Sequence, residues 1–373
     1  MKKLFFPVIF FIALPVGLPL LGVLAAGQSV RRYWEFPPLT RYVAHAPFSA
    51  PLFTGLAILG LLVATLFFLQ VIRKNGAAPG HTIPHRYPFP WWARLGLLLL
   101  LAGWIMAWNR FPWFAPWQPH TFLPLWLGYI LAVNGLTQAR TGSSLLTRRA
   151  GFFLTLFPLS ALFWWFFEYL NRFVQNWYYV GIEDFSALAY VLHASLSFAT
   201  VLPAVLSTEE LLATFARLTE PLQAAWPIRC RGGKAPAVMM LLASAAGLAG
   251  IGLRPDYLFP LLWLSPLLII TAGQKLTGRA TVFDSLGRGD WRPIWLPALA
   301  ALCCGFFWEL WNFKSQAHWV YSIPYVQKFH IFEMPILGYL GYLPFGLECK
   351  AIAASLQNAG RFNNPLPEMP AMR

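Results

Sequence analysis

Two groups of acidic, amide and aromatic residues stand near the ends of apolar segments in this chain, and their residue types suit proton-transfer chemistry. The more distinctive group contains Glu309 and Asn312, which are three residues apart and therefore share one face of a helix. A carboxyl group in apolar surroundings can serve as an acid or a base. It can also be structural, because polar side chains hold neighbouring membrane helices together. We treat Glu309 and Asn312 as candidate catalytic residues and keep the structural alternative open.

An earlier stretch of the chain repeats this group. Glu168 and Asn171 stand 141 positions before the first pair (168 and 309, 171 and 312) and are further candidate catalytic residues. A second match joins residues 122–127 with residues 259–264, in the same order along the chain. Several matches at nearly constant spacing predict an internal duplication.

Two more carboxylates follow the second group. We expect Glu333 to open the last helix, where the helix dipole favours a negative charge, and Glu348 to lie deepest in the membrane. Between them, Gly338 and Gly341 would allow a neighbouring backbone to approach closely, and Pro344 would bend the helix. Glu333 and Glu348 complete the set of candidate catalytic residues.

Aromatic residues accompany both groups. Rings of this kind form belts at the membrane interface, which is one interpretation. In the other interpretation, rings and carboxylates line one pocket, where an acid protonates an alkene and ring faces stabilise the resulting cation. The candidate substrate-binding residues are Trp177, Tyr179, Trp319, Tyr321, Tyr339 and Tyr342.

We predict no metal site and no cofactor. His318 and His330 share the loop that separates Glu309 from Glu333, but their spacing matches no compact metal-ligand motif. His193 stands alone within a predicted span, which argues against haem between helices. The chain also has no glycine-rich phosphate loop and no dinucleotide-binding fingerprint.

Composition indicates what must position these residues. The 373-residue chain is 58% hydrophobic and 11% charged, whereas a soluble domain is about 25% charged. Long apolar runs predict an all-α polytopic membrane protein rather than a β-barrel. The net charge of +14 fits the positive-inside rule, and we expect no nucleic-acid partner. The four cysteines are interpreted as small core residues: Cys230, Cys303, Cys304 and Cys349.

We expect about ten transmembrane helices, namely two N-terminal helices followed by two parallel four-helix repeats. The expected spans are residues 4–26, 51–72, 95–108, 120–136, 151–173, 187–206, 236–253, 256–272, 294–312 and 334–356. The first span is favoured over a cleaved signal peptide because it is longer than a usual signal core. The units are an N-terminal pair with a basic loop (1–90), repeat 1 (91–215), a cytoplasmic linker (216–234), repeat 2 (235–357) and a cytoplasmic tail (358–373).

The distribution of positive charge predicts orientation. With Met1 inside, most of the 28 Lys and Arg residues fall in inner connections, and the outer loops are rich in Trp, Tyr and Pro. Both termini are therefore expected in the cytoplasm, with the protein in the inner membrane and the two candidate groups at the outer face.

Part of each repeat resembles a known family. The order Trp-x-Tyr, a turn, then an apolar span with Pro and Glu is similar to the repeated unit of integral-membrane lycopene cyclases and related carotenoid hydratases. It appears as Trp177 to Tyr179, Pro203 and Glu209-Glu210, and again as Trp319 to Tyr321, Pro344 and Glu348. The resemblance implies acid–base chemistry on polyenes without redox. It covers about 60 residues; the compact Pro-x-Glu-Glu of the family is not reproduced, and these units have four spans rather than three.

Three functions are compatible with these patterns. The first is an integral-membrane enzyme acting on a hydrophobic isoprenoid or lipid substrate. The second is a transporter or flippase, although polar residues gathered at one end of the helices fit a transport path poorly. The third is a non-catalytic subunit that docks a membrane protein partner through its outer aromatic loops. All three place the chain in contact with the lipid bilayer.

Overall fold

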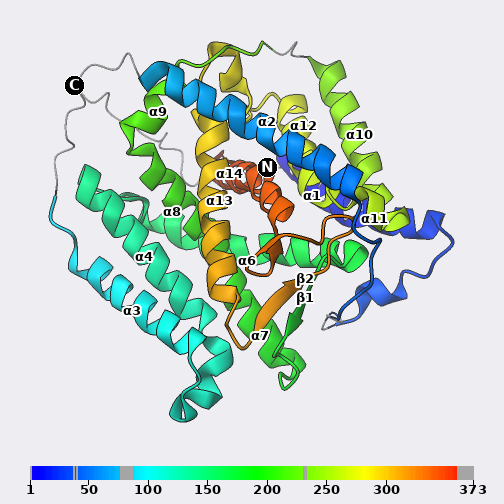
Figure 1. The fold of residues 1–373 in the computed structure, drawn as a ribbon. Coiled ribbons are helices and arrows are strands. Elements are labelled where there is room, and N and C mark those ends of the chain that lie inside the picture. The colour runs from blue at the N-terminus through cyan, green and yellow to red at the C-terminus, as the bar shows by residue number, and fades with distance from the viewer. Residues whose placement is uncertain (1, 37, 39–40, 76–86, 230–232, 359–373) are drawn as a thin grey trace.

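The fold is an all-α bundle, as the composition predicts, and the computed structural model describes residues 2–36, 38, 41–75, 87–229 and 233–358 (Figure 1). Within these ranges, seven helical segments are long and apolar enough to cross a membrane, and two shorter apolar helices accompany them. The seven are Ala50–Ile72, Trp91–Trp108, Phe122–Thr141, Ala150–Val174, Ala187–Ala213, Lys234–Leu253 and Arg292–Asn312. The shorter two are Leu14–Ala25 and Leu261–Leu276.

The elements follow one another in an order that alternates long helices with short turns. The first part contains α1 (Lys2–Ala25), η1 (Arg31–Trp34), α2 (Ala50–Asn75), α3 (Trp91–Trp108), η2 (Pro112–His120), α4 (Phe122–Thr141), α5 (Leu145–Arg148), α6 (Ala150–Val174), β1 (Trp177–Val180), α7 (Ala187–Phe198), α8 (Val201–Ala213) and α9 (Ala216–Gln223). The second contains α10 (Lys234–Leu253), α11 (Pro255–Leu258), α12 (Leu261–Leu276), η3 (Asp284–Arg288), α13 (Arg292–Asn312), β2 (His318–Tyr321), β3 (His330–Ile331), β4 (Met334–Pro335), η4 (Ile336–Gly341) and α14 (Tyr342–Asn358).

Helices α8, α13 and α14 form the centre of the bundle and pack against one another. Gly346 of α14 lies against the backbone of α13, since a Cβ there would come within 2.0 Å of the carbonyl oxygen of Pro297. In Figure 1, α3 and α4 lie on one side of this centre and α1 and α10 on the other. Close backbone contact also joins α1 to α10, where a Cβ on Gly22 would meet Ala249 O at 1.9 Å.

Helix α2 crosses the front of the bundle in Figure 1, over α12 and α13. Most of its described side chains are exposed or only partly buried, and its main packing partners are α9 and η4. At Gly60 it approaches the side chain of Leu340 in η4, 3.1 Å from a Cβ placed on the glycine. Helix α2 therefore covers the centre of the bundle with few side chains buried beneath it.

Two short antiparallel strand pairs were not expected from the sequence. Strand β1 pairs with β2 so that Trp177 faces Tyr321, Tyr178 faces Val320 and Tyr179 faces Trp319. Strand β3 pairs with β4. We call the end of the bundle that carries β1 and β2 the strand end. Alternate residues of a strand point to one face, so the Trp-x-Tyr spacing directs each tryptophan and its tyrosine the same way.

The expected last span is wrong at its start. Residues 334–335 form β4 and residues 336–341 form η4, so α14 begins at Tyr342. Glu333 therefore lies between β3 and β4 and is not in the first turn of a helix. Pro344 is the third residue of α14, where a missing N–H is tolerated, so it does not bend the helix.

Two other expected spans each contain a break in the helix. The stretch expected at 187–206 is divided into α7 and α8 by the residues 199–200, and the stretch expected at 256–272 is divided into α11 and α12. The glycine prediction is also corrected, because the space beside Gly338 is filled by the Met334 side chain and that beside Gly341 is bordered by Trp263, with no neighbouring backbone among the nearest atoms.

The cysteine interpretation is confirmed for Cys304 and Cys349, which are buried, and wrong for Cys303, which is exposed. Cys230 lies outside the described residues, as do part of the predicted linker (230–232), most of the basic loop after α2 (76–86) and nearly all of the predicted tail (359–373).

Candidate functional site

Glu168, near the strand end of α6, gathers three aromatic side chains around one carboxylate oxygen. Its Oε1 accepts hydrogen bonds from Nε1 of Trp164 at 3.0 Å, from Nε1 of Trp177 at 3.0 Å and from the hydroxyl of Tyr179 at 2.6 Å. Glu168 is buried. Trp164 comes from the preceding turn of α6, whereas the other two rings come from β1. The carboxylate therefore attaches the strand to the helix and fixes three rings relative to one another.

Glu309 holds a corresponding position on α13. Its Oε1 accepts hydrogen bonds from the hydroxyls of Tyr321 and Tyr342, both at 2.8 Å. Trp319 donates to the Tyr321 hydroxyl at 2.9 Å. Glu309 is fully buried, and its Oε2 has no hydrogen-bond partner within the described part of the chain. Both candidate carboxylates thus lie behind a layer of aromatic donors.

The side chains of the two asparagines bond to the backbone at the start of the strands and not to the carboxylates. Asn171 accepts from Asn176 N at 2.9 Å and donates to Trp177 O at 2.8 Å. Asn312 accepts from Trp319 N at 2.8 Å and donates to Trp319 O at 2.7 Å. Each amide therefore satisfies backbone groups where β1 or β2 begins, which gives both predicted asparagines a positioning role.

The two clusters differ in one of the rings that donate to the carboxylate, which is Trp164 at Glu168 and Tyr342 at Glu309. Trp164 stands four residues before Glu168, and the residue four before Glu309 is Gly305. A Cβ at Gly305 would lie 2.4 Å from the ring of Tyr342. The glycine therefore leaves the space that the Tyr342 ring fills, and the Tyr342 hydroxyl donates to the carboxylate as the Trp164 indole does in the other cluster.

The strand tyrosines are hydrogen-bond donors across the ordinary pH range. Burial, followed by the neighbouring carboxylate, raises the pKa of Tyr179 and of Tyr321 well above that of a free phenol. Both phenols therefore stay protonated and donate to the carboxylate oxygens.

A cavity of about 680 Å³ lies in front of the two clusters. Its wall includes Trp164 and rings of both strands at the strand end, and it continues along α13 past Trp308 and Ala298 to Trp295. Trp308 lies thirteen positions after Trp295 in the helix, which corresponds to about 20 Å at 1.5 Å per residue. Helix α2 closes one side of it through Leu56, Leu59, Gly60 and Val63. The cavity is therefore long, apolar and within the size range of small-molecule sites.

The predicted site residues divide into three sets. The first set lines the cavity: Trp177, Tyr179, Trp319, Tyr321 and Tyr342. Glu168 and Glu309 contact these rings but form no part of the cavity wall.

The other candidates lie apart from the two clusters. Tyr339 is outside the wall and donates to Ile331 O at 3.2 Å. Glu333 lies between β3 and β4 and is partly exposed. Glu348 is buried beside α12, where its Oε1 accepts from Leu267 N at 2.9 Å. This bond uses a backbone N–H next to Pro266, which supports a role for Glu348 in helix packing.

Sequence reasoning missed Trp164, Trp308 and Gly305. Trp164 had a usable signal, because a tryptophan four residues before a buried glutamate shares its helix face. The sequence carries no such signal for Trp308 or Gly305, because their roles depend on contacts between helices.

The described histidines form no metal centre. No group of three or more His, Cys, Asp or Glu side chains in the described ranges is arranged to hold a metal ion. His318 bonds to Gln316 O, and His330 lies near Gln327. His193, expected to have no partner, lies 3.1 Å from His120, measured between their Nδ1 atoms.

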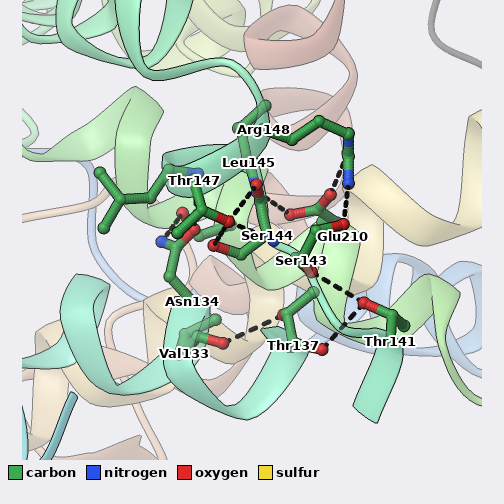
Figure 2. Close-up of polar contacts among 12 residues, drawn as sticks. Val133, Asn134, Thr137, Thr141, Ser143, Ser144, Leu145, Thr147, Arg148 and Glu210 are labelled. Carbon is green, nitrogen blue, oxygen red and sulfur yellow. Dashed lines mark hydrogen bonds and ion pairs between the residues drawn. The ribbon is translucent and has the colours of Figure 1, made fainter. Parts of the chain in front are cut away.

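Glu209 and Glu210, which carry part of the family resemblance, lie at the end of α8 that is remote from β1 and β2. Figure 2 shows Glu210 accepting from the backbone N–H of Leu145, at 2.6 Å, and forming an ion pair with Arg148. Asn134, labelled in the same view, accepts from Leu146 N at 3.0 Å. These contacts cap α5 and join α4 to α8, so they stabilise a helix connection away from the cavity.

No protein-family model, curated protein or solved structure matches this chain.

Proposed function

We propose that this membrane protein binds a lipid or isoprenoid molecule in the cavity between α2, α12, α13 and α14. The observation that carries the proposal is the shape and lining of the cavity. It runs along α13 for about 20 Å, which is two thirds of the hydrocarbon thickness of a bilayer. Apolar side chains line most of this length, and polar side chains such as Asn176, His193 and His318 contribute near the strand end. A molecule with an apolar chain and a polar end matches this distribution.

The proposal includes the predicted duplication and orientation. Two four-helix halves related by an axis along the membrane normal would place the two carboxylate clusters side by side, and the β1–β2 pairing supports this arrangement. The strand end would face the outer side of the inner membrane, with both termini in the cytoplasm, as the distribution of Lys and Arg favours. The polar end of the bound molecule would then lie at the outer face.

A photolabelling experiment tests the binding site. The purified protein, in a neutral maltoside detergent, is labelled with a fatty acid that carries a diazirine in its chain, and labelled peptides are identified by mass spectrometry. We expect labels on α12, α13 and α14. Leu264→Trp adds volume to the cavity wall and should reduce labelling, whereas Leu136→Trp, on an exposed part of α4, should leave it unchanged. Equal labelling of both variants, or labels spread over all helices, would overturn the proposal.

A second candidate function is acid–base catalysis on the bound molecule. The observation that favours it is the pair of hydroxyls on Glu309: Tyr321 and Tyr342 both reach the cavity wall while bonded to the same carboxylate oxygen. A proton could move from a phenol to the substrate and be replaced from the carboxyl group behind it. The carboxyl group would act through the tyrosines, because it does not itself reach the cavity.

Glu309→Gln tests this second function. The variant keeps an acceptor oxygen for both tyrosines but cannot supply a proton. If the protein is an acid–base enzyme, the lipid and pigment profile of cells should change while the membrane level of folded protein stays normal. Normal protein with an unchanged profile would exclude it. Loss of folded protein would instead assign Glu309 to holding the rings.

A further inference from the structure

Six aromatic residues of the cavity wall direct their N–H or O–H groups into the two carboxylate clusters behind it. Trp164, Trp177 and Tyr179 donate to Glu168. Tyr321 and Tyr342 donate to Glu309, and Trp319 donates to the Tyr321 hydroxyl. The wall therefore presents ring carbon, rather than these N–H and O–H groups, to the cavity at this level. The six residues are Trp164, Trp177, Tyr179, Trp319, Tyr321 and Tyr342.

Neither carboxylate is in direct contact with a cationic side chain of the described residues. No Lys, Arg or His of the described residues forms an ion pair with Glu168 or Glu309. Arg172, one turn after Glu168, instead donates to the carbonyl oxygens of Tyr33 and Glu35 at 2.8 Å. An ionised carboxylate here makes the attached rings more electron-rich, because it polarises the N–H and O–H bonds that point toward it. The ring faces consequently attract positive charge.

The cavity wall contains no Lys or Arg among the described residues. Further rings extend the set: Phe345 lies 5.6 Å from Trp164, 5.9 Å from Trp263 and 6.3 Å from Trp308, measured between ring centroids. A cation in the cavity would meet several rings but no carboxylate oxygen, since neither glutamate reaches the wall.

This geometry distinguishes between kinds of cation. A primary ammonium has three N–H donors that need acceptors. The carboxylates lie behind the rings, and the side-chain oxygen of Asn176, which has no partner among the described residues, offers one acceptor in the wall. A quaternary ammonium has no donor, and it binds to ring faces. We infer that the polar end of the bound molecule is a quaternary ammonium group, as in a choline-type lipid. The inference depends on the proposed function, because the chain of the molecule must occupy the cavity along α13.

A competition assay on the unmodified protein tests the inference without any variant. Three lysophospholipids with the same acyl chain compete with the diazirine fatty acid for labelling. They carry a choline headgroup, its uncharged carbon isostere (3,3-dimethylbutyl) or an ethanolamine headgroup. We expect the choline form to compete about tenfold better than both others, which corresponds to a cation–π contribution at a partly desolvated site.

The carboxylates can then be tested directly. The double variant Glu168→Gln and Glu309→Gln keeps acceptor oxygens for the rings but removes the charge. It should bring the choline form and the carbon isostere to similar affinity, while labelling by the fatty acid alone is retained. Glu220→Gln, an exposed carboxylate of α9 away from the cavity, serves as the matched control and should keep the tenfold preference.

The outcomes separate the two proposals. Equal competition by all three headgroups on the unmodified protein would overturn the quaternary-ammonium inference while leaving chain binding intact. Better competition by the ethanolamine form would also overturn it, since a primary ammonium would then find acceptors in the cavity. Labelling that shows no preference for the cavity would overturn the proposed function itself.

Discussion

Lys350 of α14 donates a hydrogen bond from Nζ to Oε1 of Glu209 in α8 at 2.7 Å, and the two residues are 141 positions apart. The same spacing separates Glu168 from Glu309. At the strand end, Tyr178 faces Val320 across the β1–β2 pair, with a spacing one residue longer. Residues at matching positions of two copies can touch each other only close to the axis that relates the copies.

Two such contacts at opposite ends of the bundle support an axis that runs from one end to the other. The extra residue has a clear location, because Asn171 bonds to the strand residue six positions later and Asn312 to the one seven positions later. In the proposed duplication the two clusters have stayed alike, and the connection between helix and strand is one residue longer in the second copy.

The Lys350–Glu209 pair offers a first prediction. The Glu209 side chain is 11% exposed, so removal of Lys350 would leave a poorly solvated charge. Lys350→Met should lower the free energy of unfolding by about 1.5–3 kcal/mol. Exchanging the charges in the double variant Glu209→Lys and Lys350→Glu should recover at least half of the loss. Thermal unfolding in detergent measures both, and a double variant no more stable than the single ones would contradict a direct pairing.

A second prediction concerns the asparagines. Asn312→Ala removes two hydrogen bonds to the backbone of Trp319 and leaves a partly buried N–H and C=O without these partners. We expect a loss of about 2–4 kcal/mol, with faster amide hydrogen exchange in both strands of the β1–β2 pair. Asn109→Ala removes an amide from an exposed helix end and serves as control. Exchange that increases throughout the bundle would show that Asn312 does not act through the strand.

A third prediction concerns the loop after η1. His45 contacts Asp256 through Nδ1 at 2.8 Å and Gln175 O through Nε2 at 3.1 Å. The imidazole thus joins the loop to Asp256 of α11 and to the residue that follows α6. Asp256→Asn should loosen the loop from α11, and limited proteolysis should then cleave residues 41–49 faster. The exposed Asp184, changed to Asn, provides the control. Equal cleavage of the two variants would contradict the role of this contact.

Much of the architecture follows from the sequence because apolar length is a local property. The long helices and the Glu–Asn pairs on α6 and α13 could be predicted, since a helix places residues three apart on one face. The strands were missed because the aromatic residues of Trp-x-Tyr were interpreted as a membrane belt or as the lining of a pocket, although alternation of aromatic residues also indicates a strand.

The start of α14 was missed for a different reason. Residues 334–341 are apolar enough to extend the helix, yet Met334 and Pro335 pair with β3 instead. The placement of the carboxylates behind the cavity wall could not be predicted either. It depends on the pairing of β1 with β2 and on the Tyr342 ring filling the space above Gly305, and both are contacts between distant parts of the chain.

The last prediction concerns the ring donor that differs between the two clusters, Trp164 at Glu168 and Tyr342 at Glu309. Gly305→Ala places a Cβ about where the Tyr342 ring now lies, so the ring must move and its bond to Glu309 is lost. We expect a loss of about 2–4 kcal/mol in the free energy of unfolding, from overpacking and from the loss of one of the two hydrogen bonds to Oε1 of Glu309. Gly305→Trp alone should prevent folding. Combining it with Tyr342→Val copies the first cluster, where Val201 occupies the position 141 residues before Tyr342. The new indole could then donate to Glu309 as Trp164 donates to Glu168, and folded protein should be recovered in membranes. If the double variant were as poorly folded as Gly305→Trp, the two clusters would not be interchangeable versions of one design.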